Sequence, residues 1–219
     1  DLYVGYYRDL HILRGVRLTA RAGAITAILG ANGVGKSTLL KTIAGFLRPD
    51  RGTITLAGQD LVGVPPYRMV KFGVAYIPQQ PGVFPDMTVE ENLALGAWPF
   101  RRDAARVRRK MEENYERFPV LREKRRQKAG ELSGGQQRMV EVGRALMSDP
   151  RVLLVDEPSA GLAVMYAREV YAMLARLRDE GITILLVDQD IRRALRVADY
   201  VYVLDLGRNR AEEIGRAHV

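Results

Sequence analysis

The sequence predicts an α/β fold in which helices cover a mostly parallel β-sheet. Five short runs are uniformly apolar and rich in β-branched residues, a pattern typical of strands buried on both faces. These runs span residues 25–29, 74–77, 152–155, 183–187 and 200–204. Helical patterns follow the first, third and fourth runs, and this alternation of strand and helix indicates α/β architecture. The expected helices span residues 36–47, 165–180 and 191–197.

Two other parts of the chain do not follow this alternation. Residues 16–19 and 52–56 are strand-like runs separated by Gly and Pro turns, so we expect a small antiparallel layer at the edge of the sheet. Residues 88–148 contain long charged helical stretches, and Thr88 with Glu91 matches a capping box, which predicts a helix start there. We therefore expect one domain over residues 1–219, with an α/β core of residues 1–85 and 149–219 and a helical subdomain of residues 86–148.

The composition is that of a globular protein, with 47% hydrophobic and 27% charged residues in a chain of 219. The chain has no cysteine, which excludes disulfides, iron–sulfur clusters and cysteine-bound zinc. It contains no apolar run of about 18 residues, the length that suggests a membrane span. The first residues also lack the basic and then apolar pattern of a secretion signal. We therefore expect that this chain neither spans a membrane nor is exported.

The positive charge of the chain is concentrated in one segment. The net charge is +8, and residues 101–128 hold 12 Lys and Arg against 5 Asp and Glu, which leaves 22 against 21 elsewhere. A solvated helical face and contact with anionic lipid headgroups both explain such a segment. Aromatic residues for stacking on bases are sparse there, namely Tyr115 and Phe118. We therefore expect no nucleic-acid partner.

A glycine-rich loop lies between the first expected strand and the first expected helix. Residues 30–37 have the sequence GANGVGKS and match the phosphate-loop pattern G-x-x-x-x-G-K-[ST]. Glycines let the backbone wrap closely around phosphate oxygens, and the helix N-terminus adds partial positive charge. We expect Lys36 to reach the β- and γ-phosphates and the Ser37 hydroxyl to bind Mg²⁺. The candidate nucleotide-binding residues here are Gly30, Asn32, Gly33, Gly35, Lys36, Ser37 and Thr38.

Two carboxylates, Asp156 and Glu157, follow the apolar run of residues 152–155. In phosphate-loop enzymes an Asp at the end of such a strand helps to hold Mg²⁺. Adjacent side chains at a strand end diverge, so we assign Asp156 to the metal and Glu157 to polarising the attacking water. Taken alone, these residues fit a strand end capped by a solvated acid better than a metal site. The phosphate loop, whose Lys36 lies 120 residues before Asp156, favours the metal and catalytic roles.

A second glycine-opened helix start lies 23 residues before Asp156, where residues 132–137 have the sequence LSGGQQ. This stretch resembles the signature of ABC ATPases. A flexible linker is the alternative, but a helical pattern follows at once. In ABC ATPases the signature of one subunit faces the phosphate loop of another, so that two ATP molecules lie between the subunits of a head-to-tail dimer. The resemblance implies that a partner's ATP contacts Ser133, Gly134, Gly135 and Gln136.

The resemblance also implies roles for an aromatic residue and a glutamine. Tyr7 occupies the place of the aromatic residue that stacks on adenine, and Tyr6 is the competing choice. Gln79 lies six residues before a proline and matches the glutamine that contacts Mg²⁺ or water and reports to the membrane subunit. The spacing favours Gln79 over its neighbour Gln80.

Two positions depart from the family pattern. Residues 159–163 resemble the segment that follows the two carboxylates, but Ala163 replaces the usual Asp, which weakens any polar contact there. Gln189 stands where most of these ATPases have a histidine, and it joins Glu157 and Lys36 as a candidate catalytic residue. An amide can hydrogen-bond to phosphate or water but cannot become positively charged. We therefore expect weaker transition-state stabilisation at this site, with slow hydrolysis or hydrolysis mainly at a partner's site.

The resemblance covers nearly the whole chain and is strongest to the second ATP-binding subunit of branched-chain amino acid uptake systems. It implies a RecA-like phosphate-loop core, an antiparallel β layer and an inserted helical subdomain. It also implies ATP and Mg²⁺ as ligands, permease subunits and a second ATP-binding subunit as partners, and an indirect link to a solute-binding protein. The expected location is the cytoplasmic face of the membrane. The implied solute is a branched-chain amino acid or a related polar solute. The alternatives are a homodimer, an exporter of lipid or polysaccharide, and a soluble non-transport ABC ATPase.

Overall fold

The computed structural model describes residues 1–7, 10–80 and 82–214, without the side chains of Tyr7 and Ile214. Its strands are β1 (Leu2–Tyr7), β2 (Leu10–Val16), β3 (Ile25–Leu29), β4 (Thr55–Leu56), β5 (Gln59–Asp60), β6 (Val74–Ile77), β7 (Val152–Asp156), β8 (Thr183–Asp188), β9 (Tyr200–Asp205) and β10 (Arg208–Ile214). Its α-helices are α1 (Lys36–Ile43), α2 (Pro66–Met69), α3 (Val89–Gly96), α4 (Ala104–Arg117), α5 (Pro119–Glu123), α6 (Gly134–Met147), α7 (Val164–Asp179) and α8 (Ile191–Val197). Short 3₁₀ helices are η1 (Val70–Phe72), η2 (Trp98–Phe100) and η3 (Ala129–Glu131).

The central sheet has the strand order β10-β9-β3-β8-β7-β6 within the described residues. Strand β3 pairs in parallel with β8 and β9, β7 pairs in parallel with β8, and β10 pairs antiparallel with β9. Leu29 lies opposite Asp188, and Asp156 lies opposite Val187, so the carboxyl ends of β3, β7 and β8 meet at one edge. The predicted α/β fold with a mostly parallel sheet is confirmed.

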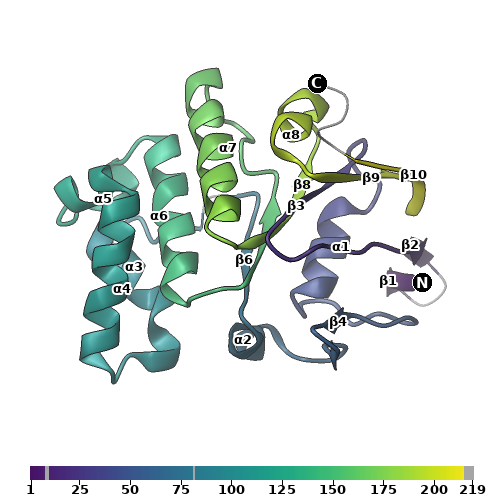
Figure 1. Ribbon diagram of the computed structural model, residues 1–219, viewed down its shortest axis with the longest axis horizontal. Helices are drawn as coiled ribbons and strands as arrows, with labels where there is room; N and C mark the ends of the chain where they lie inside the picture. Colours follow the sequence, from purple (N-terminus) through teal and green to yellow (C-terminus); the bar gives the residue numbers. More distant parts are fainter. Residues whose placement is uncertain (8–9, 81, 215–219) are drawn as a thin grey trace. The chain divides into compact units, whose positions relative to one another are not determined.

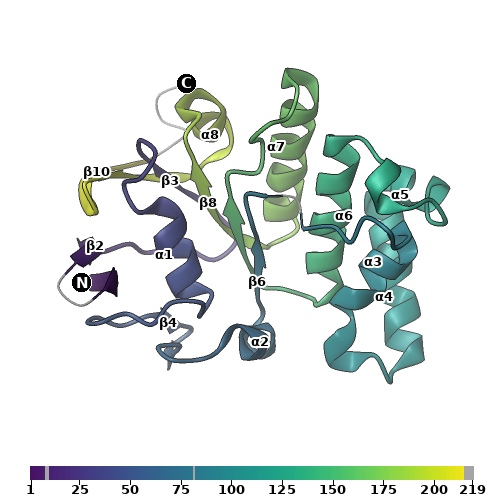
Figure 2. The ribbon, with the colours of Figure 1, turned by 180° about the vertical axis from the view of Figure 1, so that it is seen from behind.

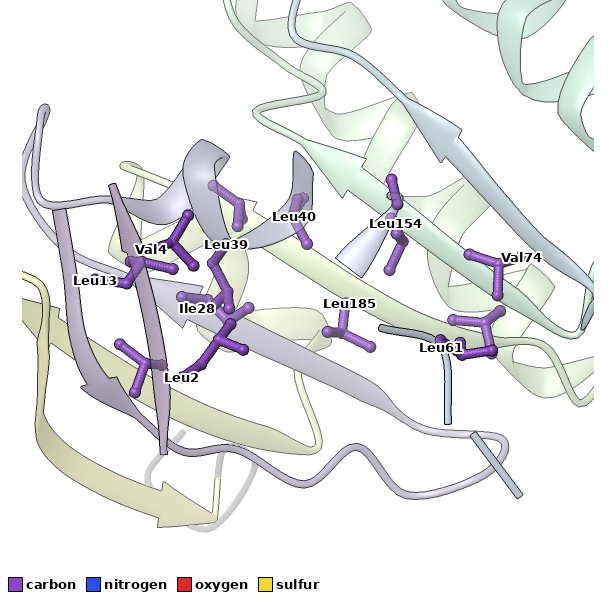
Figure 3. Close-up of a cluster of buried hydrophobic side chains, with 14 of the residues drawn as sticks. Leu2, Val4, Leu13, Ile28, Leu39, Leu40, Leu61, Val74, Leu154 and Leu185 are labelled. Atoms are coloured by element: carbon purple, nitrogen blue, oxygen red, sulfur yellow. The ribbon is translucent and has the colours of Figure 1, made fainter. Parts of the chain in front are cut away.

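The strands at the centre of the sheet are buried along their whole length, as their continuous apolarity predicts. All residues of β3, β7 and β8 are buried. One face packs on α1 and on the β1–β2 layer, and Leu39 of α1 lies near Ile28 and Leu2 in this cluster (Figure 3). Figures 1 and 2 show α1 and α8 on opposite sides of these strands. Each large apolar side chain buried here contributes roughly 1.5–3 kcal/mol relative to exposure.

The small antiparallel layer exists, but its strands differ from those expected. Strand β2 ends at Val16, where the predicted strand of residues 16–19 begins. Beyond Val16 the backbone bonds to side chains instead of a ladder: Arg17 N donates to Asn209 Oδ1 and Thr19 N donates to the Tyr202 hydroxyl. Of the predicted strand of residues 52–56, only Thr55–Leu56 belong to a strand, β4, which pairs with β5.

Helix α1 is shorter than the predicted helix of residues 36–47. It ends at Ile43 because Gly45 adopts a φ of 82°, a left-handed conformation that closes a helix C-terminus. A Cβ on Gly45 would also overlap the carbonyl oxygen of Val64. The turn therefore requires glycine for two independent reasons.

The chain divides into two compact units. The first comprises Asp1–Tyr76, Arg151–Glu157 and Tyr171–Val219. The second comprises Ile77–Pro150 and Pro158–Val170. The first unit contains β3 and α1 with the loop between them, and the second contains α3 to α6.

The second unit is a bundle in which α3, α4 and α5 pack against α6 (Figures 1 and 2). Helix α3 begins with the expected capping box, because Glu91 N donates to Thr88 Oγ1 at 3.2 Å and Thr88 N donates to Glu91 Oε2 at 2.7 Å. Glycines let α3 and α6 approach closely: a Cβ on Gly96 would overlap the carbonyl oxygen of Arg144. No helix among the described residues is long and apolar enough to cross a membrane.

Candidate nucleotide-binding site

The loop of residues 30–37 connects β3 to α1 as predicted, and its glycines have distinct structural reasons. Gly30 has a φ of 153°, and a Cβ there would overlap the carbonyl oxygen of Leu204. Gly35 has a φ of 105°, and its Cβ would lie 2.6 Å from a Leu13 methyl group. Gly33 has a φ of 82° and open space around it, so only the backbone conformation favours glycine there.

The first turn of α1 is available to an anion. Its N-cap is Gly35, which has no side chain that could cap the backbone N–H groups. Uncapped N–H groups and the helix dipole together make a helix N-terminus attractive to phosphate. Asn32 is exposed in the loop, and Thr38 is buried in the first turn of the helix.

Lys36 is buried, with its side chain 4% exposed, and its ammonium group lies within the loop. Its Nζ donates to the carbonyl oxygens of Gly30 at 2.9 Å and Ala31 at 3.0 Å. The same nitrogen lies 3.6 Å from Glu157 Oε1. The structure thus brings the predicted phosphate-binding lysine and the predicted catalytic carboxylate together at one edge of the sheet.

Asp156, at the end of β7, is buried and joined to the helix by a hydrogen bond. Ser37 Oγ donates to Asp156 Oδ1 at 2.9 Å. Tyr76 in β6 donates its hydroxyl to Asp156 Oδ2 at 3.1 Å, and its pKa is raised, first by burial and then by this carboxylate. Two of the three predicted metal ligands, Ser37 and Asp156, are therefore adjacent. Tyr76 was not predicted from the sequence, because a tyrosine within an apolar run is also an ordinary core residue.

Glu157 follows Asp156 but faces different partners. Its φ of 42° is left-handed, which turns the chain directly after the strand and directs its carboxylate to Lys36. Burial raises the pKa of Glu157 above its ordinary value, the ammonium of Lys36 opposes this, and Asp156 and Asp188 add to the rise. A carboxyl group with a raised pKa in such a setting is suited to accept a proton from water.

The end of β8 contributes a third acidic residue to this edge. Asp188 is buried, its Oδ2 accepts a hydrogen bond from the Tyr171 hydroxyl, and its Oδ1 accepts from the backbone N–H groups of Gln189 at 2.8 Å and Asp190 at 2.9 Å. Burial raises the pKa of Asp188. The Gln189 side chain is exposed directly after this strand, next along the sheet from the phosphate loop.

Ser133 and Gln136 begin α6 in the second unit and bond to one another. Gln136 N donates to Ser133 Oγ at 3.4 Å, and Ser133 N donates to Gln136 Oε1 at 3.2 Å. The sequence S-x-x-Q is a capping-box pattern, so this arrangement was readable from the sequence. Gly134 is exposed, whereas Gly135 is buried, where a Cβ would lie 2.8 Å from the Tyr166 ring.

The other predicted positions lie in less constrained surroundings. Gln79 lies in the second unit after β6 with an exposed side chain, and its carbonyl oxygen accepts from Arg138 Nη2 at 2.8 Å. Ala163 is exposed immediately before α7. The backbone of Tyr7 belongs to β1, but its side chain lies outside the described residues, and Tyr6 is 52% exposed.

The donors at the sheet edge fit a nucleotide with a hard divalent cation. Mg²⁺ takes oxygen ligands and usually combines one or two protein groups with waters and substrate phosphates. Ser37 Oγ and Asp156 supply such oxygens side by side. Lys36 and the uncapped N–H groups of α1 supply the positive charge that phosphates require.

Comparison with known proteins matches the chain to a transporter family and to ATP-binding proteins, in agreement with a nucleotide site. The family model described as ABC transporter matches residues 13–160. The chain is 42% identical, over 97% of its length and 90% of the relative, to the high-affinity branched-chain amino acid transport ATP-binding protein BraG of Pseudomonas aeruginosa. It is 40% identical, over 92% of its length and 85% of the relative, to an Archaeoglobus fulgidus protein named "Probable branched-chain amino acid transport ATP-binding protein LivF".

Other matches include an ATP-binding protein of a sulfate/thiosulfate importer and solved structures of ATP-binding cassettes. The sulfate/thiosulfate import ATP-binding protein CysA of Mycobacterium bovis is 40% identical over 95% of the chain and 58% of that relative. A nucleotide-free ATP-binding cassette from an ABC transporter superposes with a TM-score of 0.88 at 32% identity, covering 99% of this chain and 90% of the cassette. A dimeric cassette in a post-hydrolysis state, bound to ADP and Pi, gives a TM-score of 0.84 at 25% identity over 99% and 97% of the two chains.

Proposed function

Because the chain belongs to the ABC transporter family and is an ATPase of the ATP-binding cassette type, we propose that it energises an importer of branched-chain amino acids. The observation that carries the ATPase chemistry is the pairing of Ser37 with Asp156 and of Lys36 with Glu157 at one sheet edge. The amino-acid substrate is supported by the identity to the BraG and LivF proteins, which extends over nearly the whole chain.

In this proposal the phosphate loop holds ATP and the carboxylates divide the remaining work. Lys36 and the N–H groups of α1 bind the β- and γ-phosphates, and Ser37 and Asp156 hold Mg²⁺, which supplies positive charge to the phosphate oxygens when bound. Glu157 accepts the proton of the attacking water. Gln189 hydrogen-bonds the γ-phosphate or this water without adding charge, so hydrolysis at this site is slow.

The remaining site residues act through partners or at the edge of the nucleotide. Tyr7 stacks on adenine, and Gln79 contacts Mg²⁺ or water and passes the state of the site to a permease subunit. The helix start at Ser133, Gly134, Gly135 and Gln136 contacts ATP held by a second ATP-binding subunit in a head-to-tail dimer. Residues 86–148 act as the inserted helical subdomain of the domain. The chain works at the cytoplasmic face of the membrane, with permease subunits and a solute-binding protein.

A sulfate-like oxyanion is the second candidate for the transported solute. The CysA relative supports it, since its identity to the chain is close to that of the LivF protein. Solute contacts belong to the permease and binding proteins, so the cassette carries little direct information on the substrate.

Uptake measurements test this function. In the source organism, deleting the gene should lower the uptake of labelled leucine, and the parent chain should restore it. A Lys36→Ala chain should not restore uptake, because it lacks the buried ammonium that binds phosphate. The matched control is Lys41→Ala, an exposed lysine of the same helix that should restore uptake fully. Loss of sulfate uptake instead would reject the amino-acid substrate, and unchanged uptake of both solutes would reject the importer.

A further inference from the structure

A buried guanidinium group bonds the middle of α6 to a segment that comprises residues 78–80 and 82–84. Arg138 Nη1 donates to the carbonyl oxygen of Pro78 at 2.8 Å, and Arg138 Nη2 donates to that of Gln79 at 2.8 Å. One rigid planar group thus holds two consecutive carbonyl groups, which fixes both their position and their direction. The residue held in this way, Gln79, is a candidate site residue.

A carboxylate of the next helical turn completes this attachment. Glu141 Oε2 lies 2.8 Å from Arg138 Nη1, and Glu141 Oε1 accepts the backbone N–H of Gly82. A Cβ on Gly82 would lie 3.3 Å from both Glu141 Oε1 and Arg144 Nη2, so glycine permits this close approach. The segment is therefore bonded to α6 at three backbone groups, those of Pro78, Gln79 and Gly82.

The burial of this pair indicates a positioning role. The side chains of Arg138 and Glu141 are 3% and 2% exposed. Removing two charges from water costs so much that a buried ion pair is often no more stabilising than well-packed apolar side chains. Apolar residues could fill the same space, but they could not bond to two carbonyl groups and one N–H group. The charged groups thus specify where the segment lies on α6.

We propose that Arg138 and Glu141 are positioning residues that make the segment of residues 78–80 and 82–84 move with helix α6 as one body. Arg138 lies five residues after Ser133, about 7.5 Å along the helix at the usual rise per residue. A displacement of the helix start is therefore passed directly to Gln79, and a displacement of Gln79 is passed back. The consequence for ATP hydrolysis rests on the proposed function, in which Ser133 and Gln79 contact nucleotide sites.

The test measures distances within the full chain, which has no cysteine and accepts spin labels at chosen positions. Spin labels at Gln80→Cys and Gln137→Cys measure the distance between the segment and α6. Labels at Ala94→Cys and Gln137→Cys measure the distance between α3 and α6. Arg138→Lys keeps the charge near Glu141, but a single ammonium cannot replace the planar fork. We expect it to widen the first distance distribution about twofold and to leave the second unchanged. The control is Arg109→Lys, an exposed arginine of α4.

An unchanged first distribution in Arg138→Lys would overturn the proposal, as would a broad distribution in the parent chain. If Arg138→Lys does not fold, Arg138→Met combined with Glu141→Leu removes both charges together and serves the same comparison. In turnover assays Arg138→Lys should lower kcat about tenfold and keep the KM for ATP within about twofold, because the phosphate loop is untouched. Unchanged kcat despite a widened distribution would reject the coupling to hydrolysis. Turnover that persists in Lys36→Ala would instead reject the proposed function.

Discussion

At the scale of single residues, the site depends on two adjacent carboxylates with different surroundings. Asp156 accepts hydrogen bonds from Ser37 and Tyr76, which suits a group that holds a metal ion. Glu157 lies beside Lys36, and its left-handed backbone separates it from its neighbour. The two carboxylates are thus adjacent in sequence but have different partners, so they can serve different steps of one reaction.

The raised pKa of Glu157 predicts the pH dependence of ATP turnover. Only the carboxylate form accepts a proton, so kcat/KM should fall as pH decreases through the pKa of the free enzyme. Because burial raises that pKa, the acid limb should lie above pH 4.5, the ordinary value for glutamate. The measurement is kcat/KM against pH, with ATP binding measured separately at each pH. Glu123 is an exposed glutamate, and the control variant Glu123→Gln should show the same fall of kcat/KM at acid pH as the parent. A profile that stays flat down to pH 4.5 would contradict the assigned role.

Some residue-level contacts could be predicted from the sequence and others could not. The proximity of Ser37 and Asp156 follows from two motifs whose chemistry requires a shared metal. Tyr76 and Arg138 carry no such signal, because their partners are far away in the sequence or are backbone groups. Contacts of this kind depend on how strands and helices pack, which a local pattern does not encode.

At the scale of secondary-structure elements, two helices of the second unit begin with the same capping box. Thr88 and Glu91 cap α3, and Ser133 and Gln136 cap α6. The first pair was predicted as a cap, whereas Ser133 and Gln136 were assigned to phosphate binding alone. The capping box therefore stabilises the start of α3. At the start of α6 the same pattern stabilises the helix and is also proposed to contact nucleotide.

Alanine substitutions separate these two roles. Thr88→Ala and Ser133→Ala should each lower the free energy of unfolding by about 1 kcal/mol, the usual cost of losing an N-cap side chain. Only Ser133→Ala should also lower ATP turnover. Denaturant unfolding and turnover are measured on the same preparations. Equal turnover in the two variants would show that Ser133 acts only as a cap.

Element boundaries were predictable where one residue type dominates the local conformation. Helix α8 has the predicted bounds, and α1 ends early because Gly45 closes it. Strand β10 was not predicted, since its sequence RNRAEEI is polar and lies at the edge of the sheet, where strands need not be apolar. Strand β2 was misplaced because the bonds beyond Val16 come from distant side chains.

At the scale of the whole molecule, the continuous apolarity of the strands determines the fold, and the order of the strands in the sheet determines which residues meet at the site. Parallel strands with helical connections end at the same edge, so β3, β7 and β8 bring three separate sequence segments together. The loop after β3 supplies the proposed phosphate site, the end of β7 supplies Asp156 and Glu157, and the residue after β8 is Gln189. The chain belongs to the ABC transporter family, which supports ATP hydrolysis as the proposed chemistry of this edge.

The most direct test is ATP binding and hydrolysis by Glu157→Gln. The substitution keeps the shape of the side chain and removes a charge that burial already disfavours, so the fold should be preserved. The variant should bind ATP with the affinity of the parent and hydrolyse it roughly 10²–10⁴-fold more slowly, the usual contribution of a general base. Hydrolysis at the parent rate would contradict the account, because water would then be activated by another group.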